Sequence, residues 1–313
     1  MIRDFRPTQA TRLFDLLVAN FPVEERLYGM RPESWGRIVR RIYRWDTRLI
    51  LGLFRMVRRP IFRFFTIEAD GRLAATTILS FSERAGYVSM VMVDSPYRRR
   101  GYARRLLERS HEVARAAGKR YVALDVFEEN APAIALYRGM GYETLRESGL
   151  FARSLDPAAS PPTARAPSGY RRFRSSDRDP LFALALEATP ARVAEVLPPR
   201  RAAIGGSDLV DRILSGESMS FVLDGPTAPI AWVAVSVSDT MEAAVLSTPL
   251  VGPSVPAETA ADLVREAIDW AGRHGAVRVV AQTPLENRRA VAALEGAGLT
   301  LAHRLYTLYC SVR

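Results

Sequence analysis

The hydrophobic and polar residues of this chain follow a pattern whose period changes several times. Apolar residues at helical spacing predict a helix from Ala10 to Ala19, after a short strand at residues 2–6. Runs of apolar and β-branched residues predict strands at 61–69, 72–81 and 86–93. The Asp70-Gly71 pair between the first two of these is typical of a hairpin turn. The chain therefore begins with an antiparallel sheet.

The pattern after residue 100 predicts alternating helices and strands. A helix is expected to begin at about Tyr102 and to end before Gly118, and a strand follows from Tyr121 to Phe127. A short helix over residues 130–138 and two strands, at 142–146 and 149–155, complete the unit. Residues 22–60 mix aromatic residues at helical spacing with arginines, so we expect one or two irregular amphipathic helices there.

The same order of elements then occurs a second time. Residues 156–168 are rich in Pro, Ala and Ser and predict a linker. A strand at 170–174, helical material to about residue 215, a hairpin around Asp224-Gly225 and a third strand at 243–251 follow. From there a constant offset of about 157 residues aligns the two copies, and it pairs these residues: Pro96 with Pro253, Ala103 with Ala260, Gly118 with Gly275, Asn130 with Asn287, Ala133 with Ala290, and Gly141 with Gly298.

The repeat predicts two like domains rather than a solenoid. We expect a first domain at residues 1–155, the linker at 156–168 and a second domain at 169–313. The fold class is α/β (α+β), and each domain is expected to hold a mixed, mostly antiparallel sheet flanked by helices. A chain of 313 residues is long enough for two such cores.

Composition excludes some classes of protein and leaves others open. There is no apolar run long enough for a membrane span and no apolar signal-peptide core, and Cys310 is the only cysteine. These features predict a cytoplasmic protein without disulfides. The net charge of +10 lies in the first domain, where 28 Arg and Lys face 17 Asp and Glu. Because no nucleic-acid-binding motif accompanies this charge, we do not expect nucleic acid as a partner.

The stretch from residue 91 to residue 103 predicts an anion site. An apolar strand leads into Arg98-Arg99-Arg100-Gly101, and a helix begins directly afterwards. A helix N-terminus presents unpaired N–H groups, and glycine lets the backbone approach a ligand closely. A pyrophosphate would suit this arrangement, whereas the alternative is a solvated basic turn.

Two motifs together resemble a known family. Arg98-x-x-Gly101-x-Ala103, followed by Asn130-x-x-Ala133-x-x-Leu136-Tyr137-x-x-x-Gly141-Tyr142, resembles the GNAT superfamily of acyl-CoA-dependent N-acyltransferases. The resemblance covers the element order of the first domain, and its specific motifs occupy residues 91–142. It implies acetyl-CoA as cosubstrate and no metal. It implies that CoA is bound by the following residues: Val91, Met92, Val93, Arg98, Arg99, Arg100, Gly101, Tyr102, Ala103, Asn130, Ala133 and Tyr137.

The same resemblance implies the catalytic roles. Tyr137 stands where the family has a general acid that protonates the leaving thiolate, and its alternative role is a packed aromatic residue. Asp125 stands where protein N-terminal acetyltransferases of the superfamily have a glutamate as general base. Asp is one methylene shorter than Glu, which favours a water relay, and the alternative is a structural carboxylate. Glu128 and Glu129 are expected to be solvated loop charges.

The second domain lacks these residues at the same offset. Arg98 corresponds to Val255, Gly101 to Glu258, Tyr137 to Leu294 and Asp125 to Gln282. A glutamate where a pyrophosphate should bind is electrostatically unfavourable. We therefore interpret residues 169–313 as a degenerate GNAT-like domain without this chemistry.

The resulting hypothesis is an N-acetyltransferase that acts on a primary amine of a small molecule or peptide. Residues 22–63 carry 11 Arg against 4 acidic residues, so an acidic or phosphorylated acceptor is one option, and solvated helix faces are the other. The competing hypothesis is a non-catalytic acyl-CoA-binding or scaffold protein. The acceptor, the acyl chain length and the oligomeric state stay open at this stage.

Overall fold

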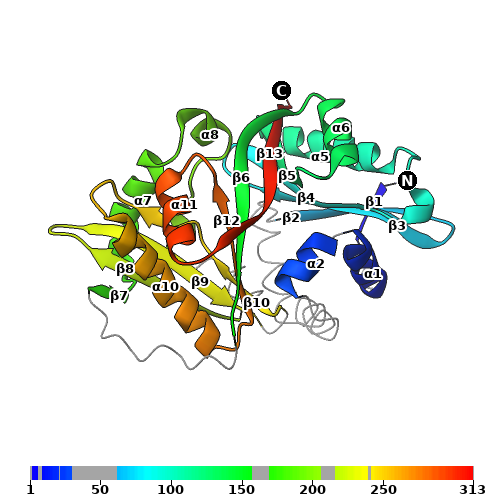
Figure 1. Ribbon diagram of the computed structural model, residues 1–313. Coiled ribbons are helices and arrows are strands. Elements are labelled where there is room, and N and C mark those ends of the chain that lie inside the picture. Colours follow the sequence, from blue (N-terminus) through cyan, green and yellow to red (C-terminus); the bar gives the residue numbers. More distant parts are fainter. Residues whose placement is uncertain are drawn as a thin grey trace.

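A single twisted sheet runs through the whole molecule, as the computed structural model shows in Figure 1. The structure describes residues 2–5, 9–20, 22–29, 62–156, 169–205, 216–238 and 241–312. Within these residues the sheet has 13 strands in the order β1-β2-β3-β4-β5-β13-β6-β12-β10-β9-β8-β7, and β11 pairs with β9. Helices flank the sheet, so the expected fold class of two α/β (α+β) units with mixed, mostly antiparallel strands is confirmed.

We call residues up to 156 the first half and residues from 169 onward the second half. The helices and strands of the first half are β1 (Ile2–Asp4), α1 (Ala10–Asn20), α2 (Pro22–Tyr28), β2 (Phe62–Ala69), β3 (Arg72–Phe81), β4 (Ala85–Val93), η2 (Ser95–Tyr97), α5 (Tyr102–Ala116), β5 (Tyr121–Phe127), α6 (Ala131–Arg138) and β6 (Glu143–Ser154).

The second half repeats much of this order. Its elements are β7 (Tyr170–Arg172), η3 (Ser175–Asp177), α7 (Arg178–Glu187), α8 (Ala191–Val196), η4 (Arg201–Ala203), β8 (Glu217–Asp224), β9 (Pro229–Val237), β10 (Ala243–Leu246), β11 (Leu250–Val251), α10 (Ala257–Arg273), β12 (Arg278–Pro284), α11 (Arg288–Gly296) and β13 (Thr300–Ser311).

Local sequence signals placed most elements of the first half correctly. The strands β3 and β5 have the predicted bounds, and α1, β2, β4, α5 and α6 lie within one or two residues of theirs. Asp70 and Gly71 have φ angles of 50° and 71°, which is the left-handed conformation that a two-residue hairpin turn needs. The predicted helices beyond residue 29 and most of the predicted linker lie outside the described residues.

Two predictions at strand ends were wrong. The two strands expected at 142–155 are one strand, β6, because β13 and β12 pair with it on both sides and satisfy the backbone at Ser148. The strand expected at 243–251 is divided into β10 and β11, since Pro249 between them lacks an N–H group. The second hairpin is present as predicted, and a 2.9 Å bond between the Gly225 N–H and the Ala228 carbonyl closes its loop.

The two halves exchange their last strands. β13 of the second half lies between β5 and β6 of the first half, and β6 lies between β13 and β12 (Figure 1). The registers repeat at the offset of 157: Asp125 pairs with Thr307, and its equivalent Gln282 pairs with Leu150, the equivalent of Thr307. The duplication is therefore also a pseudo-twofold arrangement, whose axis passes between β6 and β13.

Two large hydrophobic cores lie under the long helices. In the first half, α5 and α6 cover β2–β5 through buried residues that include Leu106, Leu107 and Leu124. In the second half, α10 and α11 cover the sheet through residues that include Leu263 and Leu294. Burial of this apolar area is the main favourable term for both halves.

Each half also places a helix on the other half. The end of α2 contacts the second half, where the Glu242 N–H donates to the Tyr28 carbonyl at 2.9 Å. In return, α8 packs on β5, and the Tyr121 hydroxyl donates to Glu195 at 2.6 Å. Strand exchange and helix docking together make the two halves one continuous structure.

Candidate active site

The strand β4 is irregular at its C-terminal part. Thr76 of β3 pairs with Met92, but Ile78 pairs with Ser89, so one extra residue is accommodated in β4. Met90 has a φ angle of 55°, and the Thr77 hydroxyl donates to the Ser89 carbonyl at 3.0 Å. This is a β-bulge, and bulges re-aim the backbone and often lie next to active sites.

Beyond the bulge, β4 and β5 separate. Their parallel pairing covers Ala85–Val88 against residues 121–124 and then ends. β5 continues to Phe127 with β13 on its other side, whereas β4 continues to Val93 without β5 as a neighbour. The backbone of residues 89–93 therefore faces an opening in the sheet on that side, where an extended ligand could pair with it.

The loop after β4 is shaped for an anion. Arg99 and Gly101 have φ angles of 63° and 78°, and Gly101 is the N-cap residue of α5. No side chain caps this helix and no acidic residue occupies its first turn. The free N–H groups of the first turn and the positive end of the helix dipole therefore point to one place. This geometry agrees with the pyrophosphate site that the sequence predicts.

The arginines of the loop have different surroundings. Arg98 turns back onto the protein, where its Nε donates to the Val93 carbonyl and its Nη2 to Asn20 Oδ1, both at 3.2 Å. The Arg100 guanidinium lies 5.3 Å from the centre of the Tyr97 ring. Arg98 therefore holds the loop against β4 and α1, while Arg99 and Arg100 are exposed and supply positive charge at the surface.

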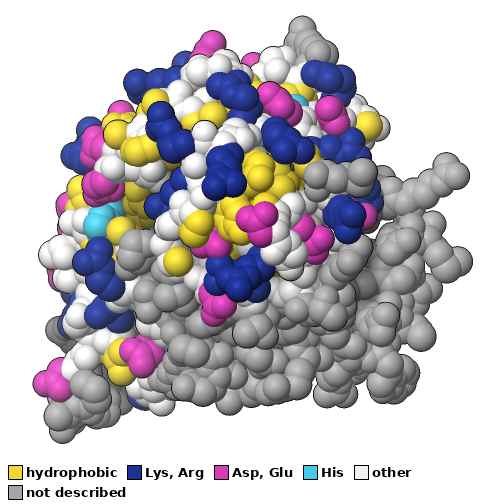
Figure 2. Space-filling view, turned by 90° about the vertical axis from the view of Figure 1, so that its right-hand side faces the viewer, with side chains coloured by type: hydrophobic (Ala, Val, Ile, Leu, Met, Phe, Trp, Pro, Cys, Tyr) yellow, Lys and Arg dark blue, Asp and Glu magenta, His cyan; other side chains and the backbone are white. Residues whose placement is uncertain are grey.

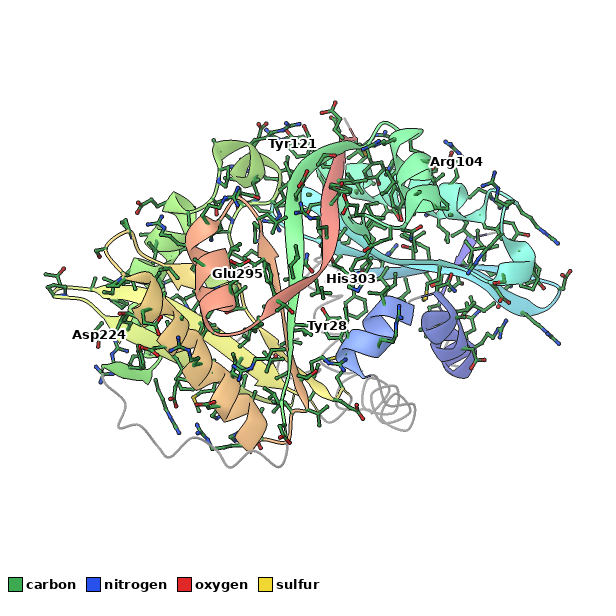
Figure 3. The ribbon with its side chains drawn as sticks, in the orientation of Figure 1. Tyr28, Arg104, Tyr121, Asp224, Glu295 and His303 are labelled. Carbon is green, nitrogen blue, oxygen red and sulfur yellow. The ribbon has the colours of Figure 1, made fainter. Side chains whose placement is uncertain are left out.

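Basic side chains continue along the start of α5. The Arg105 guanidinium lies 5.8 Å from the centre of the Tyr102 ring. The Arg104 guanidinium lies next to Gly139 at the end of α6 (Figure 3). Figure 2 views the first half from this end and shows many Lys and Arg side chains with acidic ones between them. An anionic ligand would meet a favourable field on this face.

Tyr137 lies on α6, and its ring centre is 5.8 Å from that of Tyr142. Its side chain is buried in the same cluster as Val91, Val93, Tyr102 and Ala133. Burial is the cause that raises the pKa of Tyr137 to about 12. The phenol is therefore protonated at neutral pH, as a proton donor must be.

Asn130 has a structural task in both halves. Its side-chain oxygen accepts a hydrogen bond from the Ala133 N–H at 3.3 Å and caps α6. Asn287 caps α11 in the same way, with 3.2 Å to the Ala290 N–H. The cap uses only the oxygen of the Asn130 amide. Asparagine therefore has the same capping role in both halves.

Asp125 lies on the opposite face of the sheet from Tyr137. Its neighbours Leu124 and Val126 belong to the Tyr137 cluster, so the alternation of a strand directs Asp125 to the other face. There its two oxygens accept hydrogen bonds from Thr307 Oγ1 at 2.7 Å and from Gln282 Nε2 at 2.8 Å. The structure thus gives Asp125 two partners that both come from the second half.

Sequence reasoning missed the contribution of β13 to this region. Besides Thr307, the Tyr306 hydroxyl donates to Glu128 at 2.9 Å, and His303 Nδ1 lies 3.0 Å from Glu129 Oε1. The hydrogen bond from His303 lowers the pKa of Glu129. Glu128 and Glu129 are exposed loop residues, as the sequence predicts, but their partners on β13 lie 178 and 174 residues further along the chain, where no local pattern reveals them. Figure 3 shows His303 between the two halves.

The second half has no equivalent anion loop. Val255, at the position of Arg98, is buried in the hydrophobic core, and Pro256 precedes the first turn of α10. Glu258 occupies that turn and accepts a hydrogen bond from Arg265 Nη2 at 2.7 Å. The helix end is therefore neutralised by its own carboxylate.

Two other kinds of feature are absent from the part of the chain that the structure describes. Among these residues, no helix is long and apolar enough to cross a membrane. Within the same described ranges, no group of three or more His, Cys, Asp or Glu side chains is arranged to hold a metal ion.

Comparison with known proteins gives one family match. Residues 12–142 match the family model described as the acetyltransferase (GNAT) family. No curated protein matches the chain.

Solved structures share the fold over the full length. One is a tandem GNAT protein from the clavulanic acid biosynthesis pathway, solved without acetyl-CoA, with 15% identity, a TM-score of 0.66 and coverage of 100% of this chain and 98% of that chain. Another is a GCN5-related N-acetyltransferase from Sphaerobacter thermophilus, with 18% identity, a TM-score of 0.67 and coverage of 100% and 96%. At sequence identities this low, the similarity to these structures establishes the tandem fold alone.

Proposed function

This chain belongs to the acetyltransferase (GNAT) family through residues 12–142, and from that premise we propose that it is an N-acetyltransferase. The proposed reaction transfers an acetyl group from acetyl-CoA to a primary amine of a small molecule or peptide. The two substrates would be bound at the same time, and the first half would carry the chemistry.

The binding of acetyl-CoA follows from the features of β4 and α5. The pyrophosphate would be held by the backbone N–H groups of residues 98–103, where Arg99 and Gly101 have positive φ angles. The pantetheine arm would extend along the open backbone of residues 91–93, and one of these N–H groups would polarise the thioester carbonyl. The amide nitrogen of Asn130, which the helix cap does not use, is available to the same arm.

The proton transfers can be assigned to the two faces of the opening. The amine nitrogen attacks the carbonyl carbon, the C–S bond breaks, and the products are an amide and the CoA thiol. Tyr137, on the α6 face, would donate a proton to the leaving sulfur. Asp125, on the opposite face, would take the proton that the amine loses, directly or through a water molecule. Acid and base on opposite faces suit a reaction in which the nucleophile approaches the carbonyl carbon from one side and the thiolate leaves on the other.

The identity of the acceptor stays a proposal of class only. The face opposite α6 is bordered by α2, β13 and the acidic end of β5, as Figure 3 shows for Tyr28 and His303. An acidic or phosphorylated amine would be favoured by the arginines of residues 22–63, of which the structure describes Arg26 on α2 and Arg63, which lies on the other face near Arg109.

The observation that carries this proposal is the uncapped N-terminus of α5, which follows the end of β4 that has no pairing with β5. The decisive experiment combines calorimetric titration of CoA with an acceptor screen read by intact mass. Amines, amino acids and peptides are incubated with acetyl-CoA and the full-length protein, and a gain of one acetyl group in any acceptor supports the proposal.

Two other outcomes would change the conclusion. Tight CoA binding without acetylation of any acceptor would favour a non-catalytic acyl-CoA-binding protein. Absence of CoA binding would overturn the proposal itself, since the anion loop would then have another ligand.

A further inference from the structure

The pseudo-twofold axis brings two equivalent positions of the duplicated sequence into contact. Asp125 in β5 and Gln282 in β12 are separated by the repeat offset, and their side chains are joined by the 2.8 Å hydrogen bond from Gln282 Nε2 to Asp125 Oδ2. The registers around them are the same, since Asp125 pairs with Thr307 and Gln282 with Leu150. If positions 125 and 282 carried the same residue type, two identical side chains would therefore be in contact across the axis.

Two ionised carboxylates in this place would repel each other, because a like charge at short distance disfavours the charged form of a carboxyl group. An amide at position 282 reverses the interaction, because its N–H group donates to the carboxylate at 2.8 Å. The amide therefore supplies a donor to Asp125 without placing a second negative charge beside it.

Thr307 supplies the second fixed donor. Its side chain is fully buried, and its hydroxyl donates to Asp125 Oδ1 at 2.7 Å while Arg146 Nε lies 3.4 Å from the same hydroxyl oxygen. The remaining groups that face Asp125 are Tyr87 on β4 and Arg146 on β6. Burial first, and then the Asp125 charge and a hydrogen bond to Asp125, raise the pKa of Tyr87. Gln282 and Thr307 are the donors that the second half contributes, from β12 and β13.

We propose that Gln282 and Thr307 are positioning residues for Asp125, and that position 282 must be uncharged for Asp125 to act as proton acceptor. This inference rests on the proposed function. It gives the second half a role in the reaction: it has lost its own site, and it orients the carboxylate of the other one. It also gives a reason for an amide rather than a carboxylate at position 282.

The first test places a second carboxylate on the axis. The full-length Gln282→Glu variant is compared with wild type by thiol release from acetyl-CoA with water as acceptor, between pH 5 and pH 9. Asp125 is also titrated by carbon NMR of its side-chain carboxyl. We expect both the acid limb of the rate profile and the Asp125 titration to move upward by about one pH unit or more. Unchanged profiles in both measurements would overturn the proposal.

The second test exchanges the two side chains. The double variant Asp125→Asn with Gln282→Glu keeps one carboxylate, one amide and the same net charge on the axis. We expect a melting temperature close to that of wild type and a loss of thiol release of at least tenfold, because the carboxylate then belongs to the wrong strand. If the exchange variant were as active as wild type, the hydrogen bond between positions 125 and 282 would have only a structural role between the two halves, and the positioning role would be wrong.

A matched pair of variants isolates Thr307. Thr307→Val removes the donor, and Thr307→Ser restores it; we expect thiol release to fall several-fold in the first and to recover in the second. Thr300→Val is the control on the same strand, since its hydroxyl contacts the Ala152 carbonyl at 3.4 Å and not Asp125. Equal loss in Thr300→Val and Thr307→Val would point to a general defect of β13.

Failure of this inference can be told apart from failure of the proposed function. CoA titration of the wild type tests the proposed function alone. If wild type binds CoA and releases thiol while all axis variants behave like it, only the positioning role is wrong.

Discussion

The burial of Tyr137 shows how one residue obtains a property that its type does not guarantee. An exposed tyrosine has a pKa near 10, whereas burial in the core of the first half raises the pKa of Tyr137 to about 12. The side chain is therefore protonated at any physiological pH, as the proposed proton donor must be.

Replacing Tyr137 by Phe tests the role of its hydroxyl. We expect turnover to fall by about 10²-fold or more, within the range that acid–base catalysis contributes, while the Kd for CoA stays nearly unchanged. Steady-state kinetics with the acceptor found in the screen and calorimetry with CoA measure the two effects. Tyr170→Phe is a suitable control, because it removes a tyrosine hydroxyl that packs against the core of the second half. Equal turnover in wild type and Tyr137→Phe would remove Tyr137 from the mechanism.

His111 gives a prediction about the pH dependence of stability. Burial, and secondly the charge of Arg115, lower the pKa of His111, and its Nε2 lies 2.7 Å from the Tyr142 hydroxyl. Since the folded protein favours the neutral ring, this stability is present above the unfolded pKa of about 6.5 and is lost as the pH falls below it.

The His111→Gln variant should therefore lose less stability than wild type between pH 7.5 and pH 5. Urea unfolding midpoints measured across this range give the slope of stability against pH for each protein. A constant difference in stability between the two proteins does not affect this comparison. His274→Gln serves as the control for removing a histidine from the other half. A wild-type slope that persists in His111→Gln would assign the acid sensitivity to other groups.

At the scale of elements, the start of α5 depends on a backbone conformation. Gly101 has a φ angle of 78° and open space around it. A side chain there would therefore strain the backbone but would not clash with neighbouring atoms. Such strain costs about 1–3 kcal/mol for a β-branched residue and is smaller for Asn.

We expect Gly101→Val to weaken CoA binding by about tenfold or more, because the strain displaces the first-turn N–H groups, and Gly101→Asn to weaken it less. Gly118→Val is a matched control: it has a φ of 70° and equal space at the other end of the same helix. Calorimetric titration with CoA compares the three variants. If Gly118→Val weakens binding as much as Gly101→Val, the effect is one of helix stability.

At the scale of the whole molecule, strand exchange makes each half depend on the other. Without the second half, β5 would have an unpaired edge along Tyr121–Phe127, and β6 would lose both neighbours. Unpaired edges of this kind promote aggregation. The predicted division of the chain at residues 156–168 remains a prediction about sequence organisation, and the sheet continues across it.

We therefore expect fragments 1–156 and 169–313 to be insoluble or aggregated when each is produced alone. When both are produced together, a 1:1 complex with the CoA affinity of the intact chain should form. Size-exclusion chromatography with light scattering and CoA titration measure these outcomes. A soluble, monomeric fragment 1–156 that binds CoA would show that β13 is dispensable for the first half.

The sequence by itself determined the elements that depend on local chemistry. Hydrophobic period and turn residues placed α1, β3, β5 and α5, and the Arg98–Gly101 loop before a helix predicted an anion site. The offset of 157 also identified the duplication, because equivalent positions keep the same packing requirements. These features involve residues that are neighbours along the chain, so their signals are local.

The tertiary structure alone decided how the two copies share their strands. No local signal shows that β13 pairs with β5, that Tyr137 and Asp125 lie on opposite faces, or that Gln282 meets Asp125 on an axis. The exchanged and the unexchanged arrangement use the same strands and bury the same hydrophobic faces. Which of them forms depends on contacts between residues more than 150 positions apart, and a pattern read along the chain does not contain that information.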